Sequence, residues 1–190
     1  MLILVKKNFV QTLLLLVGFI CLSQTALSQD AAAPPARAES EKAIRAALYE
    51  ISVATQSGDA KTFKKYAAQR TLKFYEALVE ELLKNPKVKE QLGRAKVTNG
   101  DSFIDFSFRS VAQRASATPR PKIEEFASEY QNSPLTFVSD TEAKVETKAG
   151  MLKVVREADE WKVDGTDGLK KALLASLPLS TESKEKLERF

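Results

Sequence analysis

A single carboxylate in an aromatic-rich segment is the first candidate for chemistry in this sequence. Asp105 lies between Ile104 and Phe106, and apolar neighbours that remove water from a carboxylate raise its pKa. Such a group can act as a general base near hydroxyl donors. The chain supplies four donors, which are Tyr49, Tyr66, Tyr75 and Tyr130. The alternative, which is usual for an isolated carboxylate, is a solvated Asp105 paired with Arg109.

The residue types that are missing exclude several classes of catalytic site. The chain has no histidine and one cysteine, so a Ser-His-Asp triad, a Cys-His pair and a histidine metal site are excluded. None of its seven glycines belongs to a GxxxxGKS/T or GxGxxG phosphate loop. Asp164 and Asp167 lack the spacing of a calcium loop and suit a turn or a helix cap better. We therefore expect neither a metal nor a cofactor.

Aromatic side chains are the candidates for the wall of a ligand pocket. Five of them are singled out, namely Tyr66, Tyr75, Phe103, Phe108 and Trp161. The alternative for each is a place in the hydrophobic core, and the alternating residues around Trp161 favour that place for the tryptophan. A pocket built from these rings would take a small apolar ligand.

Two groups of basic residues are candidates for contact with an anionic surface, such as a lipid head group or a cell-wall polymer. The first group is Lys61, Lys64, Lys65, Arg70 and Lys73. The second group is Arg109, Arg114, Arg120 and Lys122. Glutamates are interspersed in both segments, which favours ordinary solvated faces.

The first 28 residues have the pattern of a secretory signal peptide. Two lysines precede an apolar run over 9–22, and the small residues Ala26 and Ser28 supply a cleavage site. The run is shorter than the ~20 apolar residues of a membrane span. We expect export to the periplasm or the medium after cleavage near Ser28, so that membrane contact ends with the signal. An uncleaved anchor is the alternative.

Length and charge fit one exported domain without disulfides. The chain has 190 residues, which is typical of one domain with short appendages. Loss of the signal removes Cys21 and two of the 29 basic residues, so the net charge falls from +4 to +2. A mature chain without cysteine depends on core burial alone in an oxidising compartment. So small a net charge does not favour nucleic acid as a partner.

The mature chain divides into a linker, one domain and a tail. Residues 29–39 form an Ala/Pro-rich linker, 40–177 the domain and 178–190 a charged tail with the composition of a frayed helix. Apolar residues at helical spacing predict helices over 41–56, 60–67, 71–84, 86–92, 121–131 and 169–177.

The segment 94–115 has two interpretations. Asn99-Gly100 between two apolar stretches is typical of a β-hairpin with a type I′ turn. The spacing of Ile104 and Phe108 also fits a helix capped by Asp101. We favour the helix.

From residue 135 the apolar period changes to two. It predicts strands over 135–138, 142–148, 152–157 and 161–164. Connections this short join antiparallel neighbours, so the strands form a meander with one apolar face. The helices upstream are the elements available to cover that face. The sequence therefore predicts an α+β fold.

Two short motifs carry a family resemblance. The helix ending in ATQSGDA (54–60), followed by a helix with Phe63, and the final strand EWKVD (160–164) resemble the cone-shaped superfamily of nuclear transport factor two, with its SnoaL-like and ketosteroid-isomerase-like relatives. The resemblance covers 42–67 and 135–165. It implies a curved four-stranded sheet around a long helix, a pocket at the open end and pairing of two copies through the open sheet face. That fold hosts enzymes, binding modules and assembly domains alike.

Three functional hypotheses follow. The favoured one is an exported, non-catalytic binding or accessory domain, which takes a small apolar ligand or an envelope protein. The second is an isomerase- or dehydratase-like enzyme that uses Asp105 with tyrosine donors. The third is a structural envelope protein whose basic groups dock on an anionic polymer.

Overall fold

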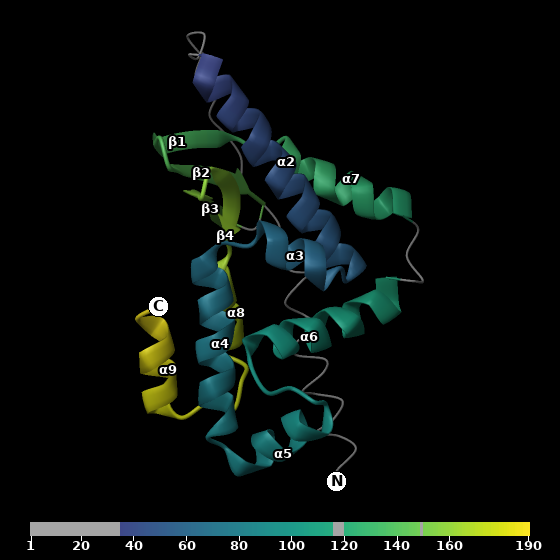
Figure 1. Ribbon diagram of the computed structural model, residues 1–190, viewed down its shortest axis with the longest axis vertical. Helices are drawn as coiled ribbons and strands as arrows, with labels where there is room; N and C mark the ends of the chain where they lie inside the picture. The colour runs from purple at the N-terminus through teal and green to yellow at the C-terminus, as the bar shows by residue number, and fades with distance from the viewer. Residues whose placement is uncertain (1–34, 116–119, 149) are drawn as a thin grey trace.

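The computed structural model describes residues 35–115, 120–148 and 150–190, which form eight helices and a four-stranded sheet (Figure 1). The helices are α2 (Pro35–Ser57), α3 (Ala60–Tyr66), α4 (Gln69–Leu83), α5 (Pro86–Arg94), α6 (Gly100–Ala115), α7 (Arg120–Gln131), α8 (Thr166–Leu173) and α9 (Thr181–Glu188). The strands are β1 (Leu135–Ser139), β2 (Glu142–Thr147), β3 (Gly150–Glu157) and β4 (Glu160–Asp164).

The sheet is an antiparallel meander in the order β1-β2-β3-β4. Its β3–β4 connection is a two-residue turn in which Ala158 and Asp159 both have positive φ, 47° and 66°. Turns with two positive φ angles match the right-handed twist of the strands they join. The predicted α+β fold with four antiparallel strands is confirmed.

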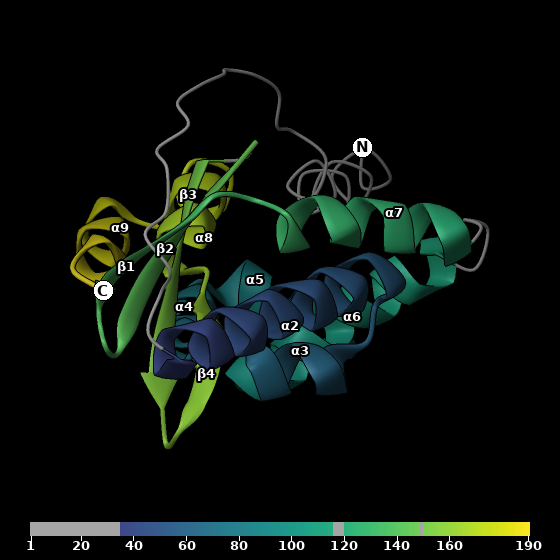
Figure 2. The ribbon, with the colours of Figure 1, turned by 90° about the horizontal axis from the view of Figure 1, so that it is seen from above.

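Two apolar clusters form the core. In the sheet cluster, Ile44 and Leu48 of α2 pack on the inward side chains of the strands, which are Ala143, Val145, Val154, Trp161 and Val163. Helix α2 crosses the sheet on this face, and α7 lies along α2 in both views (Figures 1 and 2). The apolar face of the meander is therefore covered by the first described helix, as its alternation predicts.

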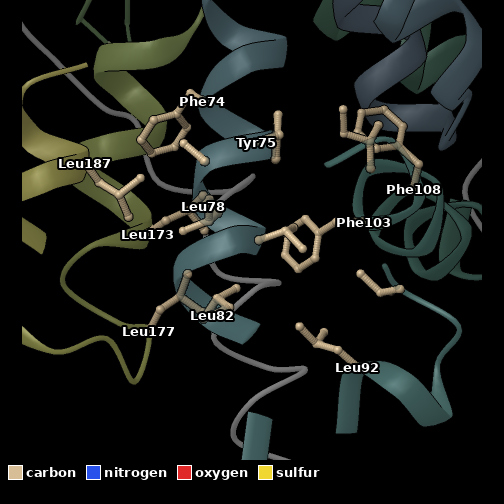
Figure 3. Packing of buried hydrophobic residues seen from close by; sticks show 14 of the residues in the cluster. Phe74, Tyr75, Leu78, Leu82, Leu92, Phe103, Phe108, Leu173, Leu177 and Leu187 are labelled. Carbon is tan, nitrogen blue, oxygen red and sulfur yellow. The ribbon is translucent and has the colours of Figure 1, made fainter. Parts of the chain in front are cut away.

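The helix cluster is centred on α4 (Figure 3). Phe74, Leu78 and Leu82 of α4 are fully buried, and they recur at the spacing of four residues that keeps side chains on one helix face. Side chains from α3, α5, α6, α8 and α9 pack around them. Helix α4 therefore fixes the positions of the elements that surround it.

Residues 100–115 form helix α6, so the helical interpretation of that segment is confirmed. Its cap was predicted wrongly, because Asn99 and not Asp101 begins the helix. The side-chain oxygen of Asn99 accepts the backbone N–H of Ser102 at 2.9 Å. A Cβ at Gly100 would lie 2.5 Å from the backbone nitrogen of Glu76 on α4. The Asn-Gly pair therefore serves a helix start in close contact with α4 instead of a hairpin.

Loss of the α6 cap is expected to destabilise the protein measurably. Asn99→Ala removes the acceptor for the N–H of Ser102, and such a change costs about 1 kcal/mol. Thr98→Ala is the matched control, because its side chain is exposed next to the cap and such changes stay within about 0.5 kcal/mol. Urea unfolding measures the free energy of unfolding of both variants. Equal stability of the two variants would contradict the role given to Asn99.

The two ends of the described chain correct the predicted boundaries. Helix α2 begins at Pro35 inside the predicted linker, because proline is favoured in the first helical turn. The predicted charged tail contains helix α9, whose Leu187 is fully buried. The ring of Phe190 packs edge-on against Phe74 of α4, with ring centroids 6.0 Å apart. The predicted signal, 1–28, lies outside the described residues, and within them no helix has the length and apolarity of a membrane span.

Candidate functional site

Asp105 lies on α6 in a polar environment. Its carboxylate is 2.7 Å from the ammonium of Lys64 on α3, and its side chain is 46% exposed. A helix turns about 100° per residue, so Phe103 lies on the opposite side of α6 from Asp105. The expectation that aromatic rings desolvate this carboxylate is therefore wrong. The partner of Asp105 is also not the Arg109 that its spacing indicated.

Three of the five aromatic pocket candidates are packing residues of the helix cluster. Tyr75, Phe103 and Phe108 are buried there (Figure 3), and burial raises the pKa of the Tyr75 hydroxyl. The ring centroids of Tyr75 and Phe103 are 6.2 Å apart. Trp161 belongs to the sheet cluster, and half-buried Tyr66 lies under the ammonium of Lys65. The structure thus distributes these residues over two clusters and the surface.

An open groove lies between α3, α4 and α6, with a volume of about 230 Å³. We call it the α3–α4–α6 groove. Its apolar lining is Leu72 of α4 and Ile104 of α6, and its charged lining comes from all three helices. The lining residues are Lys64, Gln69, Leu72, Lys73, Glu76, Asp101 and Ile104. None of the five aromatic candidates is among them.

A lysine between two carboxylates ties α3 to α6 at the groove. The ammonium of Lys64 lies 2.5 Å from Asp101 and 2.7 Å from Asp105. The two aspartates are four residues apart and so share one face of α6. Burial of Lys64 opposes its charged form, but the hydrogen bonds to both aspartates outweigh that effect and raise the pKa of Lys64. The ammonium therefore stays charged.

A second polar contact ties α4 to α6. The carboxylate of Glu76 accepts the backbone N–H of Gly100 at 2.6 Å, at the start of α6, where a helix N-terminus favours negative charge. Within the described part of the chain, the ammonium of exposed Lys73 has no hydrogen bond or ion pair. The groove thus combines fixed charges, two aliphatic side chains and one available cation.

Two of the five residues in the first basic group predicted from the sequence are neutralised by carboxylates. Lys64 is paired as above, and Arg70 contacts Asp164 and Asp167, each at 3.0 Å. Asp164 also accepts the backbone N–H of Thr166 at 3.0 Å at the start of α8. This bond belongs to the turn that precedes α8, whose N-cap is Gly165 without a side-chain cap bond. Within the described residues no three acidic or cysteine side chains gather as metal ligands.

Comparison of the chain with protein-family models, with curated proteins and with solved structures finds no match. The resemblance to the superfamily of nuclear transport factor two therefore stays a prediction. The functional argument depends on the geometry of the groove.

Proposed function

We propose that this protein is an exported, non-catalytic binding or accessory domain, and that the α3–α4–α6 groove is its ligand site. The observation that carries this proposal is the pairing of charges around the groove. Lys64 is held by Asp101 and Asp105, and Glu76 by Gly100. Groups held in this way are preorganised for recognition, and they are engaged with each other instead of being poised for proton transfer.

The lining indicates the class of ligand. Leu72 and the small accessible part of buried Ile104 offer apolar contact, and Lys73 offers a charge-assisted hydrogen bond to an acidic group. A small amphiphile with one acidic group satisfies both requirements. This proposal changes the predicted apolar ligand into an acidic one, and moves its site from the aromatic residues to the groove.

The fold family and the export remain parts of the same proposal. The long helix α2 against a four-stranded meander supports kinship with the cone-shaped superfamily. Two lysines, an apolar run over 9–22 and a small-residue cleavage site support export. The enzyme hypothesis is not carried further, because Asp105 is paired with Lys64 and Tyr75 is buried in the helix cluster.

Native mass spectrometry of the protein purified from its own cells tests the proposal. We expect a mass that begins at Gln29 and a co-purifying small acid. Lys73→Glu should weaken the affinity about tenfold or more and so lower the occupancy, because a hydrogen bond to a charged group contributes ~1.5–3 kcal/mol. Lys61→Glu, at an exposed position outside the groove, should leave occupancy unchanged.

Three results would overturn the proposal. An uncleaved chain in the envelope fraction would remove the exported form. A bound molecule that Lys73→Glu retains at full occupancy would place the ligand outside the groove, and the absence of any bound molecule would leave the groove without its expected ligand.

A further inference from the structure

Helix α5 forms one end of the described fold. It crosses the end of α4 at the bottom of the view in Figure 1, at the extreme of the long axis among the described residues. The segment 84–96 that contains it has one acidic residue, Glu90, and five basic residues. The basic residues are Lys84, Lys87, Lys89, Arg94 and Lys96, all exposed. We call these five residues the basic end.

The orientation of α5 is fixed by two buried side chains. Val88 and Leu92, four residues apart, are buried in the helix cluster. With about 100° per residue, Lys87 and Lys89 then lie on the two flanks of α5, and Glu90 and Arg94 face outward. A plane that approaches α5 from outside therefore meets both lysines.

Much of the charge at the basic end is available to a partner. Lys84 pairs with Glu81 and Arg94 with Glu90. Lys87, Lys89 and Lys96 have no ion pair or hydrogen bond from their side chains within the described residues. This contrasts with Lys64 and Arg70, each of which is engaged by two carboxylates. Among the described residues, the basic end thus holds three lysines without an ion pair, and it lies outside both of the basic groups predicted from the sequence.

We propose that the basic end docks on the surface of an anionic phospholipid bilayer. A cluster of four to eight Lys and Arg residues has the charge that such a surface attracts, by about 1 kcal/mol for each residue. The apolar side chains of α5 point into the core, so the contact is with head groups and not with acyl chains. The charges lie on the flanks and at both ends of a short helix, an arrangement that suits a plane better than a linear polymer.

Vesicle co-sedimentation of the protein purified from its own cells tests this docking. Vesicles of phosphatidylcholine alone are compared with vesicles that contain a third of phosphatidylglycerol, at low salt. We expect stronger binding to the anionic vesicles, and its loss at about 0.5 M salt, because screening shortens the electrostatic range to a few ångströms. Lys87→Glu with Lys89→Glu should weaken anionic binding at least about 25-fold, the effect of about 1 kcal/mol at each position.

The matched control is Lys61→Glu with Lys144→Glu. It makes the same change in net charge at exposed positions on α3 and β2, and we expect it to retain most of the binding. Circular dichroism confirms that both double variants fold. Equal binding to neutral and anionic vesicles, or equal loss in both double variants, would overturn the proposal. Binding to soluble polyphosphate without binding to anionic vesicles would overturn it in favour of a polymer partner.

Discussion

Gly58→Ala is expected to destabilise the protein by about 3–5 kcal/mol, since it combines backbone strain with a clash. Gly58 has a φ of +77° at the end of α2, where only glycine is unstrained. A Cβ there would lie 2.3 Å from the backbone nitrogen of Ala112 and 2.5 Å from the carbonyl oxygen of Phe108. Both atoms belong to the backbone of α6, so relief of the clash requires α6 to move away from α2.

Two other glycines separate these effects. Gly150 also has positive φ, +118°, but a Cβ there meets nothing within 4 Å, so Gly150→Ala should show the strain alone, about 1–2 kcal/mol. Gly168 lies inside α8 with open space around it, and Gly168→Ala should be neutral or stabilising by up to about 1 kcal/mol. Urea unfolding compares all three. A loss for Gly58→Ala no larger than that for Gly150→Ala would refute the close approach of α6.

Gly58 also shows where the sequence is informative and where it is not. The sequence Ser57-Gly58-Asp59 predicts a helix end, and Gly58 and Asp59 do donate their backbone N–H groups to the carbonyl oxygen of Ala54. That signal is local. The contact with Ala112 lies more than fifty residues away along the chain, and no pattern of spacing or composition indicates it.

The same difference between local signals and contacts of distant segments applies to the whole fold. An apolar period of two and short connections predicted all four strands, because a meander is specified by neighbours in sequence. Helical periodicity predicted the helices, whereas their ends moved where a cap or proline acts, as at Pro35 and Asn99. Helix α9 has few apolar residues, so its polar composition concealed the burial of Leu187.

The candidate site was predicted least well. Asp105 drew attention through its neighbours in sequence, but a helix places those neighbours on other faces. The spacing of Asp101 and Asp105 shows that they share a face of α6 once the segment is known to be helical. That Lys64 of α3 lies against this face depends on how α3, α4 and α6 pack together. Such packing is a property of the folded chain, which local patterns do not contain.

Replacement of both lysines that neutralise Glu81 should destabilise the protein by about 3–5 kcal/mol at neutral pH. The Glu81 side chain has no exposed surface, and its carboxylate lies 2.6 Å from Lys84 and 2.8 Å from Lys186. The hydroxyl of Ser183 on α9 donates to it at 2.7 Å. Lys84→Met with Lys186→Met leaves the buried carboxylate with the hydroxyl alone, which is too weak to offset the loss of hydration.

Glu81→Gln is the control for this charge. It keeps the shape and lets the amide oxygen accept from Ser183, so we expect a smaller loss, about 1.5–3 kcal/mol. Added to the double lysine variant, Glu81→Gln should restore part of the stability, because the unpaired buried charge is gone. Guanidinium unfolding of the native protein, the double lysine variant, Glu81→Gln and their combination gives the four free energies of a double-mutant cycle. A further loss on adding Glu81→Gln would mean that the carboxylate does not depend on the lysines.

The dependence of stability on pH gives an independent check of the charge of Glu81. On acidification, protonation of Glu81 should destabilise the native protein, whereas it should stabilise the double lysine variant. In the native protein, burial favours the neutral acid, but hydrogen bonds from Lys186, Lys84 and Ser183 outweigh it and lower the pKa of Glu81 from 4.5 to about 2. The unfolded chain therefore binds the proton more readily, so the stabilisation is full above pH 4.5 and is lost between pH 4.5 and about 2.

In the double lysine variant the lysine contribution is absent, and burial alone acts on Glu81. The pKa of the folded state then lies above that of the unfolded chain. Its destabilisation is complete above the raised pKa and diminishes as the pH falls through it, because protonation removes the buried charge. The gap between native and variant stability should therefore narrow on acidification. A gap that is constant from neutral pH to about pH 3 would show that the lysines stabilise α9 by packing and not through the charge of Glu81.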